Sequence, residues 1–220
     1  MSEPLLRLAN LRFAYGSRLV LAGVDLELFA AERVALTGAN GSGKTTLFRC
    51  ITGLEKAQAG EIVFAGCKTR TEKDFQALRR RLGYAVQNAE DQLIFPTVLE
   101  DICFGPLNLG LTEEAAQARA LAQLAELGLA GFDQRLTHQL SGGQQKLAAM
   151  AAVLVMRPEV LLLDEPFNGL DDAACERLCA VLDGLGCGMI VVSHETQWLD
   201  RLCNRRLLLA NGRLVRQDVR

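Results

Sequence analysis

The stretch GANGSGKTT, residues 38–46, decides the fold. It follows a short apolar run and matches the phosphate-binding pattern GxxxxGK[ST] at Gly38, Gly43, Lys44 and Thr45. Glycines let the backbone curl until successive N–H groups point at phosphate oxygens, and a helix that begins at Lys44 adds the positive end of its dipole. A chance glycine turn is the alternative, but the preceding apolar run supplies the strand that the motif requires. The sequence therefore predicts an α/β domain with a phosphate site between a strand and a helix.

A magnesium site and a general base are predicted beside this loop. The Lys44 ammonium is expected to reach the β- and γ-phosphates, and the Thr45 hydroxyl to ligate Mg²⁺. The run VLLLDE at 160–165 places Asp164 at the end of an apolar strand, where it can reach the metal. Glu165 follows it and suits a base that polarises the attacking water. An acidic pair at a strand end is also common without any such role.

Two further polar residues are predicted to end strands of the same sheet. Gln87 ends GYAVQ and could ligate Mg²⁺ or hold water. His194 follows MIVVS, on a strand expected beside the one that ends at Asp164, with its side chain toward the γ-phosphate. For His138 a structural role is expected.

A second glycine-rich loop, LSGGQ, stands at 140–144. Ser141 and Gln144 match a capping box, in which Ser141 caps a helix and Gln144 reaches back to it. Gly142 and Gly143 are poor residues for a helix start because each loses extra backbone entropy on folding. They are better explained if something must approach the backbone closely, such as a phosphate that is held elsewhere.

The composition favours a packed protein without a nucleic-acid surface. Half of the 220 residues are apolar, and the formal net charge of −2 gives no basic footprint. The apolar run 147–156 is too short to span a bilayer, and no export signal is expected at the N-terminus. The seven cysteines form no CxxC pair, so ordinary thiols are expected, although Cys175 and Cys179 could share a helix face.

The remaining pattern predicts a core interrupted by a helical lobe. Helices are expected at about 44–52 and over most of 97–156, with Thr112 as an N-cap, and Asn211-Gly212 predicts a hairpin turn. The core is expected at 1–90 and 152–220, and the lobe at about 91–151. The expected strands are LLRLANLRFAY (5–15), VDLELF (24–29), RVALTG (33–38), EIVFAG (61–66), GYAVQ (83–87), VLLLDE (160–165) and MIVVSHE (189–195).

The order of these motifs resembles the nucleotide-binding subunit of ATP-binding-cassette (ABC) proteins over essentially the whole chain. The resemblance implies a P-loop (RecA-like) core with an antiparallel β subdomain and an inserted α-helical subdomain, with ATP and Mg²⁺ as ligands. In that family LSGGQ faces the ATP held by another copy of the domain. A partner cassette, either a second copy or a close paralogue, is therefore expected.

The resemblance also carries over individual residues. Tyr15 takes the place of an aromatic that stacks on adenine, with a core aromatic as the alternative. Asp171 matches the acidic residue of the loop that crosses the dimer interface. Asn168-Gly169 and Leu147 depart from the usual family residues, and Leu147 stands where many members have arginine. The implied ATP contacts are Gly38, Asn40, Gly41, Gly43, Lys44, Thr45 and Thr46 within the chain, and Ser141, Gly142, Gly143 and Gln144 to the partner's ATP.

The segment 87–111, QNAEDQLIFPTVLEDICFGPLNLGL, resembles the energy-coupling-factor branch of the family. The resemblance implies an integral membrane coupling subunit, a substrate-binding membrane subunit and a place on the cytoplasmic face of the membrane. Asp91, Gln92, Leu93 and Phe95 offer a polar rim with apolar anchors for an amphipathic helix. Packing within the lobe, without a partner, is the alternative.

A short chain with QQKL after LSGG favours a cobalt or nickel importer over a vitamin importer such as one for biotin. A soluble cassette that acts on ribosomes or DNA is the rival from another class. Such proteins usually carry two cassettes or a long coiled coil, and neither is found here. An ATP-binding subunit without turnover is a further rival, disfavoured by Glu165 and His194.

Overall fold

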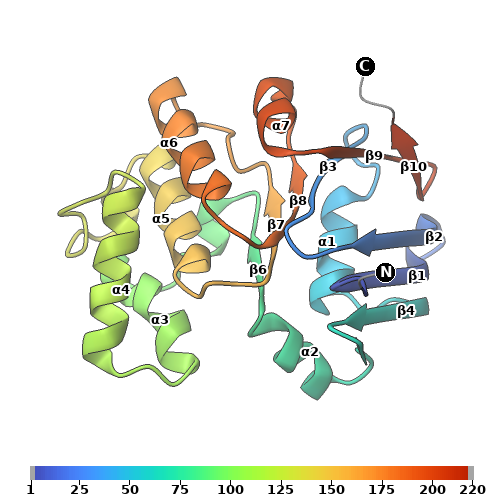
Figure 1. The fold of residues 1–220 in the computed structure, drawn as a ribbon, viewed down its shortest axis with the longest axis horizontal. Helices are drawn as coiled ribbons and strands as arrows, with labels where there is room; N and C mark the ends of the chain where they lie inside the picture. The colour runs from blue at the N-terminus through green and yellow to red at the C-terminus, as the bar shows by residue number, and fades with distance from the viewer. Residues whose placement is uncertain (1–2, 218–220) are drawn as a thin grey trace. The chain divides into compact units, whose positions relative to one another are not determined.

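The computed structural model describes residues 3–217, and the chain divides into two compact units (Figure 1). The first comprises Met1–Tyr84 and Gly186–Arg220, each in its described part, and Glu159–Asp164. The second comprises Ala85–Pro158 and Glu165–Leu185, and the predicted lobe at 91–151 falls within it. Among residues 3–217, no helix has both the length and the apolar character needed to cross a bilayer.

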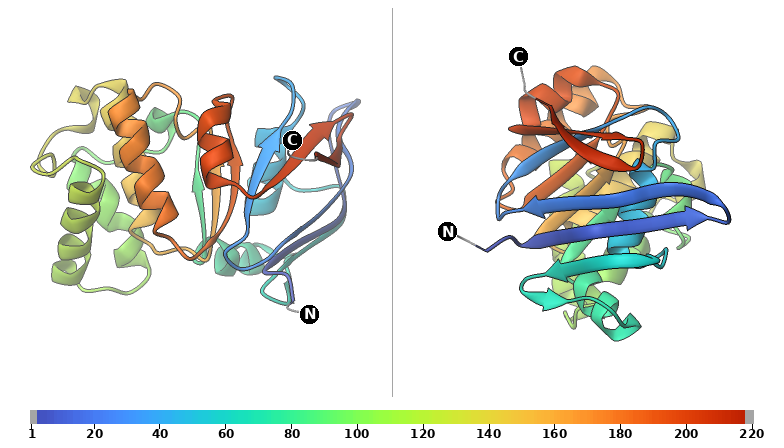
Figure 2. Two further views of the ribbon diagram at one scale, coloured as in Figure 1. Left: turned by 45° about the horizontal axis from the view of Figure 1, so that its top comes forward. Right: turned by 90° about the vertical axis from the view of Figure 1, so that its right-hand side faces the viewer.

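An antiparallel sheet lies in the first unit, with the strand order β2-β1-β4-β5 (Figure 2, right). Side chains on β1 alternate between buried and exposed, as the sequence predicts. A bulge next to Asn10, whose φ is 48°, shifts this alternation by one residue. The strands are β1 (Leu6–Tyr15), β2 (Arg18–Leu28), β4 (Ala59–Phe64) and β5 (Cys67–Lys68).

A mainly parallel sheet has the order β10-β9-β3-β8-β7-β6. Every residue of β7 and β8 is buried, as expected for central strands covered on both faces. The antiparallel hairpin of β9 and β10 turns at Asn211 and Gly212, with φ of 51° and 70°, which confirms the predicted turn. The strands are β3 (Arg33–Thr37), β6 (Leu82–Ala85), β7 (Val160–Asp164), β8 (Gly188–Val192), β9 (Arg205–Ala210) and β10 (Arg213–Gln217).

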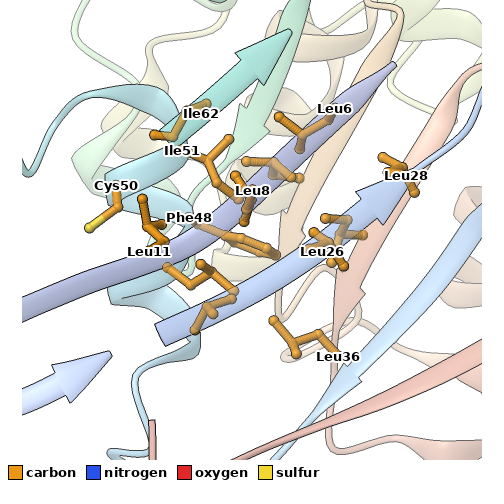
Figure 3. Packing of buried hydrophobic residues seen from close by; sticks show 14 of the residues in the cluster. Leu6, Leu8, Leu11, Leu26, Leu28, Leu36, Phe48, Cys50, Ile51 and Ile62 are labelled. Carbon is orange, nitrogen blue, oxygen red and sulfur yellow. The ribbon is translucent and has the colours of Figure 1, made fainter. Parts of the chain in front are cut away.

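Helix α1 (Lys44–Thr52), which has the predicted bounds, is fixed by the core of the first unit. Its apolar face, which includes Phe48 and Ile51, is buried in a cluster with Leu8 of β1 and Leu36 of β3 (Figure 3). Burial of such side chains stabilises by about 1.5–3 kcal/mol each. The phosphate loop therefore leads into a helix that cannot shift without disturbing the core. The other helices of this unit are α2 (Glu72–Arg79) and α7 (Thr196–Leu202).

The second unit is mostly helical. Helix α3 packs against α4 and α5, and side chains cap the N-termini of these helices, including the predicted cap Thr112. The helices are α3 (Val98–Asn108), α4 (Glu113–Glu126), α5 (Gly142–Leu154) and α6 (Asp172–Asp183), with short 3-10 turns η1 (Ala89–Asp91) and η2 (Thr137–Gln139).

Several strands have other bounds than predicted, such as β2, which begins at Arg18 and not at Val24, and one of these differences affects a predicted site residue. The sequence places Gln87 at the end of a strand, but β6 ends at Ala85. Gln87 and Asn88 are exposed and lead into η1, so Gln87 stands on a loop. The antiparallel strands, the phosphate-loop core and the helical region together confirm the predicted fold class.

Candidate functional site

The phosphate loop depends on two glycines that no other residue can replace without strain. Gly38 and Gly43 have φ of 149° and 106°, in the region that favours glycine. A Cβ on Gly38 would lie 2.7 Å from the Leu209 carbonyl oxygen, and one on Gly43 would lie 2.7 Å from Val20 Cγ1. The curl of the loop is therefore built into the packing of the first unit.

The N-terminus of α1 is left open for an anion. Its N-cap is Gly43, no side chain caps it, and no acidic residue stands in its first turn. Helices α2 to α6, by contrast, are each capped by a serine, threonine or aspartate side chain. The first N–H groups of a helix need acceptors and carry partial positive charge. A phosphate at this end of α1 would satisfy both requirements.

Donors inside the loop also fit a polyphosphate. Lys44 is buried, and its ammonium donates to the carbonyl oxygens of Gly38 (2.7 Å) and Ala39 (3.1 Å). The Ser42 hydroxyl is buried without a hydrogen-bond partner among the described residues. Buried polar groups are normally paired, so an orphaned hydroxyl in this loop indicates a missing ligand oxygen.

Two oxygen-bearing side chains that suit a magnesium ion meet at the end of β7. The Thr45 hydroxyl donates to Asp164 Oδ2 at 2.7 Å, and Asp164 is buried. Among residues 3–217, no cluster of three His, Cys, Asp or Glu side chains is placed to hold a metal. Magnesium is commonly bound by one or two protein oxygens together with substrate phosphates. The Thr45–Asp164 pair beside the phosphate loop fits that arrangement.

Tyr15 and His194, two further residues predicted for the site, also lie in the first unit. Tyr15 is 45% exposed, packs edge-on against Phe13 and donates to Glu55 Oε1 at 3.2 Å, so the alternative of a core aromatic is wrong. His194 is exposed two residues beyond β8. Strand β8 pairs in parallel with β7, which places Val192 opposite Asp164 and confirms the predicted neighbouring strands.

Glu165 has an unusual backbone conformation. Its φ is 53°, although it is not glycine, and its side chain is buried. Such a conformation costs of the order of 1–3 kcal/mol and clusters at functional sites. The backbone turns sharply at Glu165, directly after the buried Asp164. This turn sets the direction in which the Glu165 side chain leaves the backbone.

The second glycine loop caps α5 as predicted. Ser141 Oγ accepts from the Gln144 N–H at 3.4 Å, and Gln144 Oε1 accepts from the Ser141 N–H at 3.0 Å. A Cβ on Gly143 would lie 3.2 Å from the Gly169 carbonyl oxygen, whereas one on Gly142 would meet nothing within 4 Å. Packing in the described chain therefore does not require a glycine at 142. An approach from outside would explain it.

Asp91 and Gln92, both predicted to contact a membrane partner, differ in how far their side chains are available for such a contact. Asp91 is exposed, but both ends of the Gln92 amide are engaged within the second unit. Gln92 Nε2 donates to the Ala149 carbonyl at 2.6 Å, and Gln92 Oε1 accepts from the Val86 N–H at 3.3 Å. A role for Gln92 in gripping a partner stays a prediction, and it would require these bonds to open.

The burial of Lys146 was not predicted from the sequence. It is buried in the second turn of α5, and its ammonium donates to the Gln87 carbonyl at 2.6 Å. The sequence shows only a lysine after two glutamines, with nothing to indicate burial.

Asp101 was also missed. Its Oδ1 accepts from the N–H groups of Ile94 (2.9 Å) and Phe95 (3.1 Å), while Oδ2 is buried without a partner among the described residues. Burial raises the pKa of this carboxyl. The only signal in the sequence is an acidic pair at the start of a helix.

Known proteins resemble this chain in sequence and fold. The ABC transporter family pattern matches residues 21–168. A Brucella suis protein provisionally named ABC transporter ATP-binding protein is 47% identical, with 97% of this chain and 89% of the relative covered. The energy-coupling factor transporter ATP-binding protein EcfA of Methanothermobacter thermautotrophicus is 36% identical (96% and 70% covered). The cobalt import ATP-binding protein CbiO of Rhodobacter capsulatus is 41% identical (96% and 78% covered).

Two solved structures of ABC transporter proteins have a similar fold. The structure of cbiO1 from Clostridium perfringens, described as part of the ABC transporter complex cbiONQ, has a TM-score of 0.83 at 31% identity, with 97% of this chain and 88% of that one covered. The bacterial ABC transporter cassette MJ0796, solved as a dimer, has a TM-score of 0.90 at 28% identity, with 98% and 99% covered. The chain therefore belongs to the ABC transporter family and is the subunit of such a transporter that hydrolyses ATP.

Proposed function

We propose that the chain is the ATPase of an energy-coupling-factor type importer on the cytoplasmic face of the membrane, and that it powers uptake of cobalt or nickel. The observation that best supports a role in transport is the exposed apolar surface of the segment 94–107, where a membrane subunit could bind. Ile94 is 70% exposed, and Phe104 and Leu107 are also exposed. The names of the EcfA and CbiO relatives support the branch and the metal.

ATP binding uses residues from two chains. Within one chain, Tyr15 stacks on the adenine and the phosphate loop holds the phosphates through Gly38, Asn40, Gly41, Gly43, Lys44, Thr45 and Thr46. The partner chain presents Ser141, Gly142, Gly143 and Gln144. The open space at Gly142 supports this reading because it leaves the backbone of α5 accessible. Each chain carries one loop of each kind, so two chains are needed to complete each site.

Hydrolysis uses groups at the ends of the parallel strands. Thr45 and Asp164 would hold Mg²⁺, with Gln87 as a further oxygen ligand or water-holding group, and the ion, when bound, would supply charge neutralisation to the phosphates. Glu165 accepts a proton from the attacking water, and His194 holds the γ-phosphate. Asp171 transmits the state of the site across the dimer interface. The closed dimer binds ATP more tightly than the open one, because the γ-phosphate bridges the two chains. Loss of the γ-phosphate therefore opens the dimer.

A membrane subunit would bind the helical unit of the cassette. Phe95, Phe104 and Leu107 line an apolar depression of about 280 Å³ whose lining also includes Glu100 and Glu113. Apolar anchors flanked by acidic groups suit an amphipathic helix with basic residues. Asp91 and Leu93 extend the contact surface. The membrane coupling subunit would follow the cassettes as they close and open, and a membrane subunit that binds the solute would complete the importer.

The test is co-purification from detergent-solubilised membranes of the native host with a tagged chain. Recovery of integral membrane subunits is expected, and a metal-binding partner would name the solute class. The variant Phe104→Asp is expected to lose these partners. Leu121→Asp, at an exposed leucine of α4 outside the depression, is the matched control and should keep them. A vitamin-binding partner would replace the metal proposal, and recovery with ribosomes alone would overturn the importer.

A further inference from the structure

The loop that carries Gln87 is tied to α5 at two points. The Lys146 ammonium donates to the Gln87 carbonyl, and the Gln92 amide donates to the Ala149 carbonyl, each at 2.6 Å. Both bonds lie within the second compact unit. The backbone of 87–92 is therefore held against the first turns of the helix that LSGGQ begins.

The burial of Lys146 requires an explanation. Lys146 is only 7% exposed and stands in a helix whose next residues, Leu147 to Ala151, are buried and apolar. A buried ammonium is costly unless it is hydrogen-bonded and its charge is compensated. Methionine would fill the same space without this cost. The bond to the Gln87 carbonyl satisfies one donor, and Glu90 and Asp91 line the same polar depression as Lys146.

We propose that Lys146 is a positioning residue that makes the Gln87 loop and the LSGGQ helix move as one body. The proposal rests on the roles of Gln87 and of Ser141–Gln144 given under Proposed function. An α-helix is stiff over its first turns, so a shift of Ser141 toward the partner's ATP moves Lys146 with it. The Lys146 bond then moves the Gln87 backbone. Binding of ATP to the partner chain therefore sets the position of Gln87 beside the ATP that is bound by the same chain as Gln87.

The second tie alone does not fix Gln87. Without the Lys146 bond, the segment would still be held to α5 by the packing of η1, which begins two residues after Gln87, and by the Gln92 hydrogen bond beyond it. The Gln87 peptide would then be free to shift while the rest of the unit stayed folded. Loss of Lys146 is therefore expected to uncouple the loop from the helix rather than to unfold the unit.

Amide hydrogen exchange of the full chain tests this in a Glu165→Gln background, which slows hydrolysis, with Mg-ATP added. In that parent, ATP should slow exchange both in 141–147 and in 86–92. With Lys146→Met added, protection of 141–147 should remain, while 86–92 should exchange about tenfold faster than in the parent with ATP, since one charge-assisted hydrogen bond is lost. Lys146→Arg should restore most of the protection. Lys73→Met, at an exposed lysine of α2, is the matched control and should change neither segment.

The outcomes distinguish the positioning role of Lys146 from the contact of LSGGQ across the dimer. Equal protection of 86–92 in the Lys146→Met protein and the parent would overturn the positioning role, as would an arginine variant that behaves like methionine. If Lys146→Met does not fold, Lys146→Gln, which is neutral but can donate, replaces it with the same expectation of weaker coupling. If ATP protects no part of 141–147 in the parent, the contact across the dimer is wrong, and the positioning role falls with it.

Discussion

At the scale of single residues, Asp101 shapes the surface that we propose a membrane subunit binds. One carboxylate oxygen accepts from two successive N–H groups, those of Ile94 and Phe95, and so fixes the backbone that presents both side chains. The carboxylate is 7% exposed and its second oxygen has no partner among the described residues. The residue therefore keeps the loop in shape at the expense of an unfavourable buried charge.

We expect Asp101→Ala to destabilise the protein by about 1–3 kcal/mol, because the N–H groups of Ile94 and Phe95 lose a partly buried, charged acceptor. Asp101→Asn should cost less, since its amide oxygen can still accept from both. Urea unfolding measures the difference. A loss in the alanine variant no larger than that of an exposed aspartate such as Asp91→Ala would contradict this role.

The raised pKa of Asp101 adds a pH dependence of definite sign. A carboxyl whose folded-state pKa is raised stabilises the folded state most when it is protonated, and this contribution is lost as pH rises through the folded pKa. The stability of the wild type relative to Asp101→Asn should therefore increase as pH falls from neutral toward the usual carboxyl pKa. A constant difference over that range would contradict a raised pKa.

At the scale of elements, sequence patterns predicted most of what positions the site. The alternation in β1, the apolar runs of β7 and β8, and the caps Thr112 and Ser141 were correct because each is a local property of the chain. The end of β6 was wrong because GYAVQ stays apolar beyond the residues that pair. The ties of Lys146 and Asp101 could not be predicted, since their acceptors and donors lie up to 59 residues away or in a loop of irregular backbone.

Helix α1 carries a buried thiol with a measurable consequence. Burial, and to a lesser degree the nearby Glu55 carboxylate, raise the pKa of Cys50 to about 12. A raised thiol pKa means that the unfolded chain ionises first, so stability falls as pH rises above about 9, the ordinary value in the unfolded chain. The wild type should lose stability between pH 8 and pH 10.5 more steeply than Cys50→Ala, as urea titrations would show. Parallel curves for the two proteins would contradict the shifted pKa.

At the scale of the whole molecule, the ATP site that we propose is shared between two chains. With Mg-ATP and Glu165→Gln, we expect the mass in solution to double, as light scattering would show. Gly142→Arg should prevent this doubling while the isolated chain stays folded and still binds ATP, because a side chain at 142 meets open space within the chain. Gly186→Arg places the same side chain at another open, exposed glycine and should dimerise normally. Dimerisation of the Gly142→Arg protein would mean that the LSGGQ loop faces something other than the partner's nucleotide.

The uncapped start of α1 has a consequence for the life of the protein. A side chain caps the N-terminus of every helix from α2 to α6, but the first N–H groups of α1 have no side-chain cap and need a bound anion as their acceptor. A nucleotide that binds only the folded chain adds RT ln(1 + [L]/Kd) to its stability, about 2.7 kcal/mol at a hundredfold excess over Kd. In starved cells, where ATP falls, the cassette would open and be degraded sooner. ATP would thus also stabilise the fold, and the abundance of the transporter would follow the energy supply of its host.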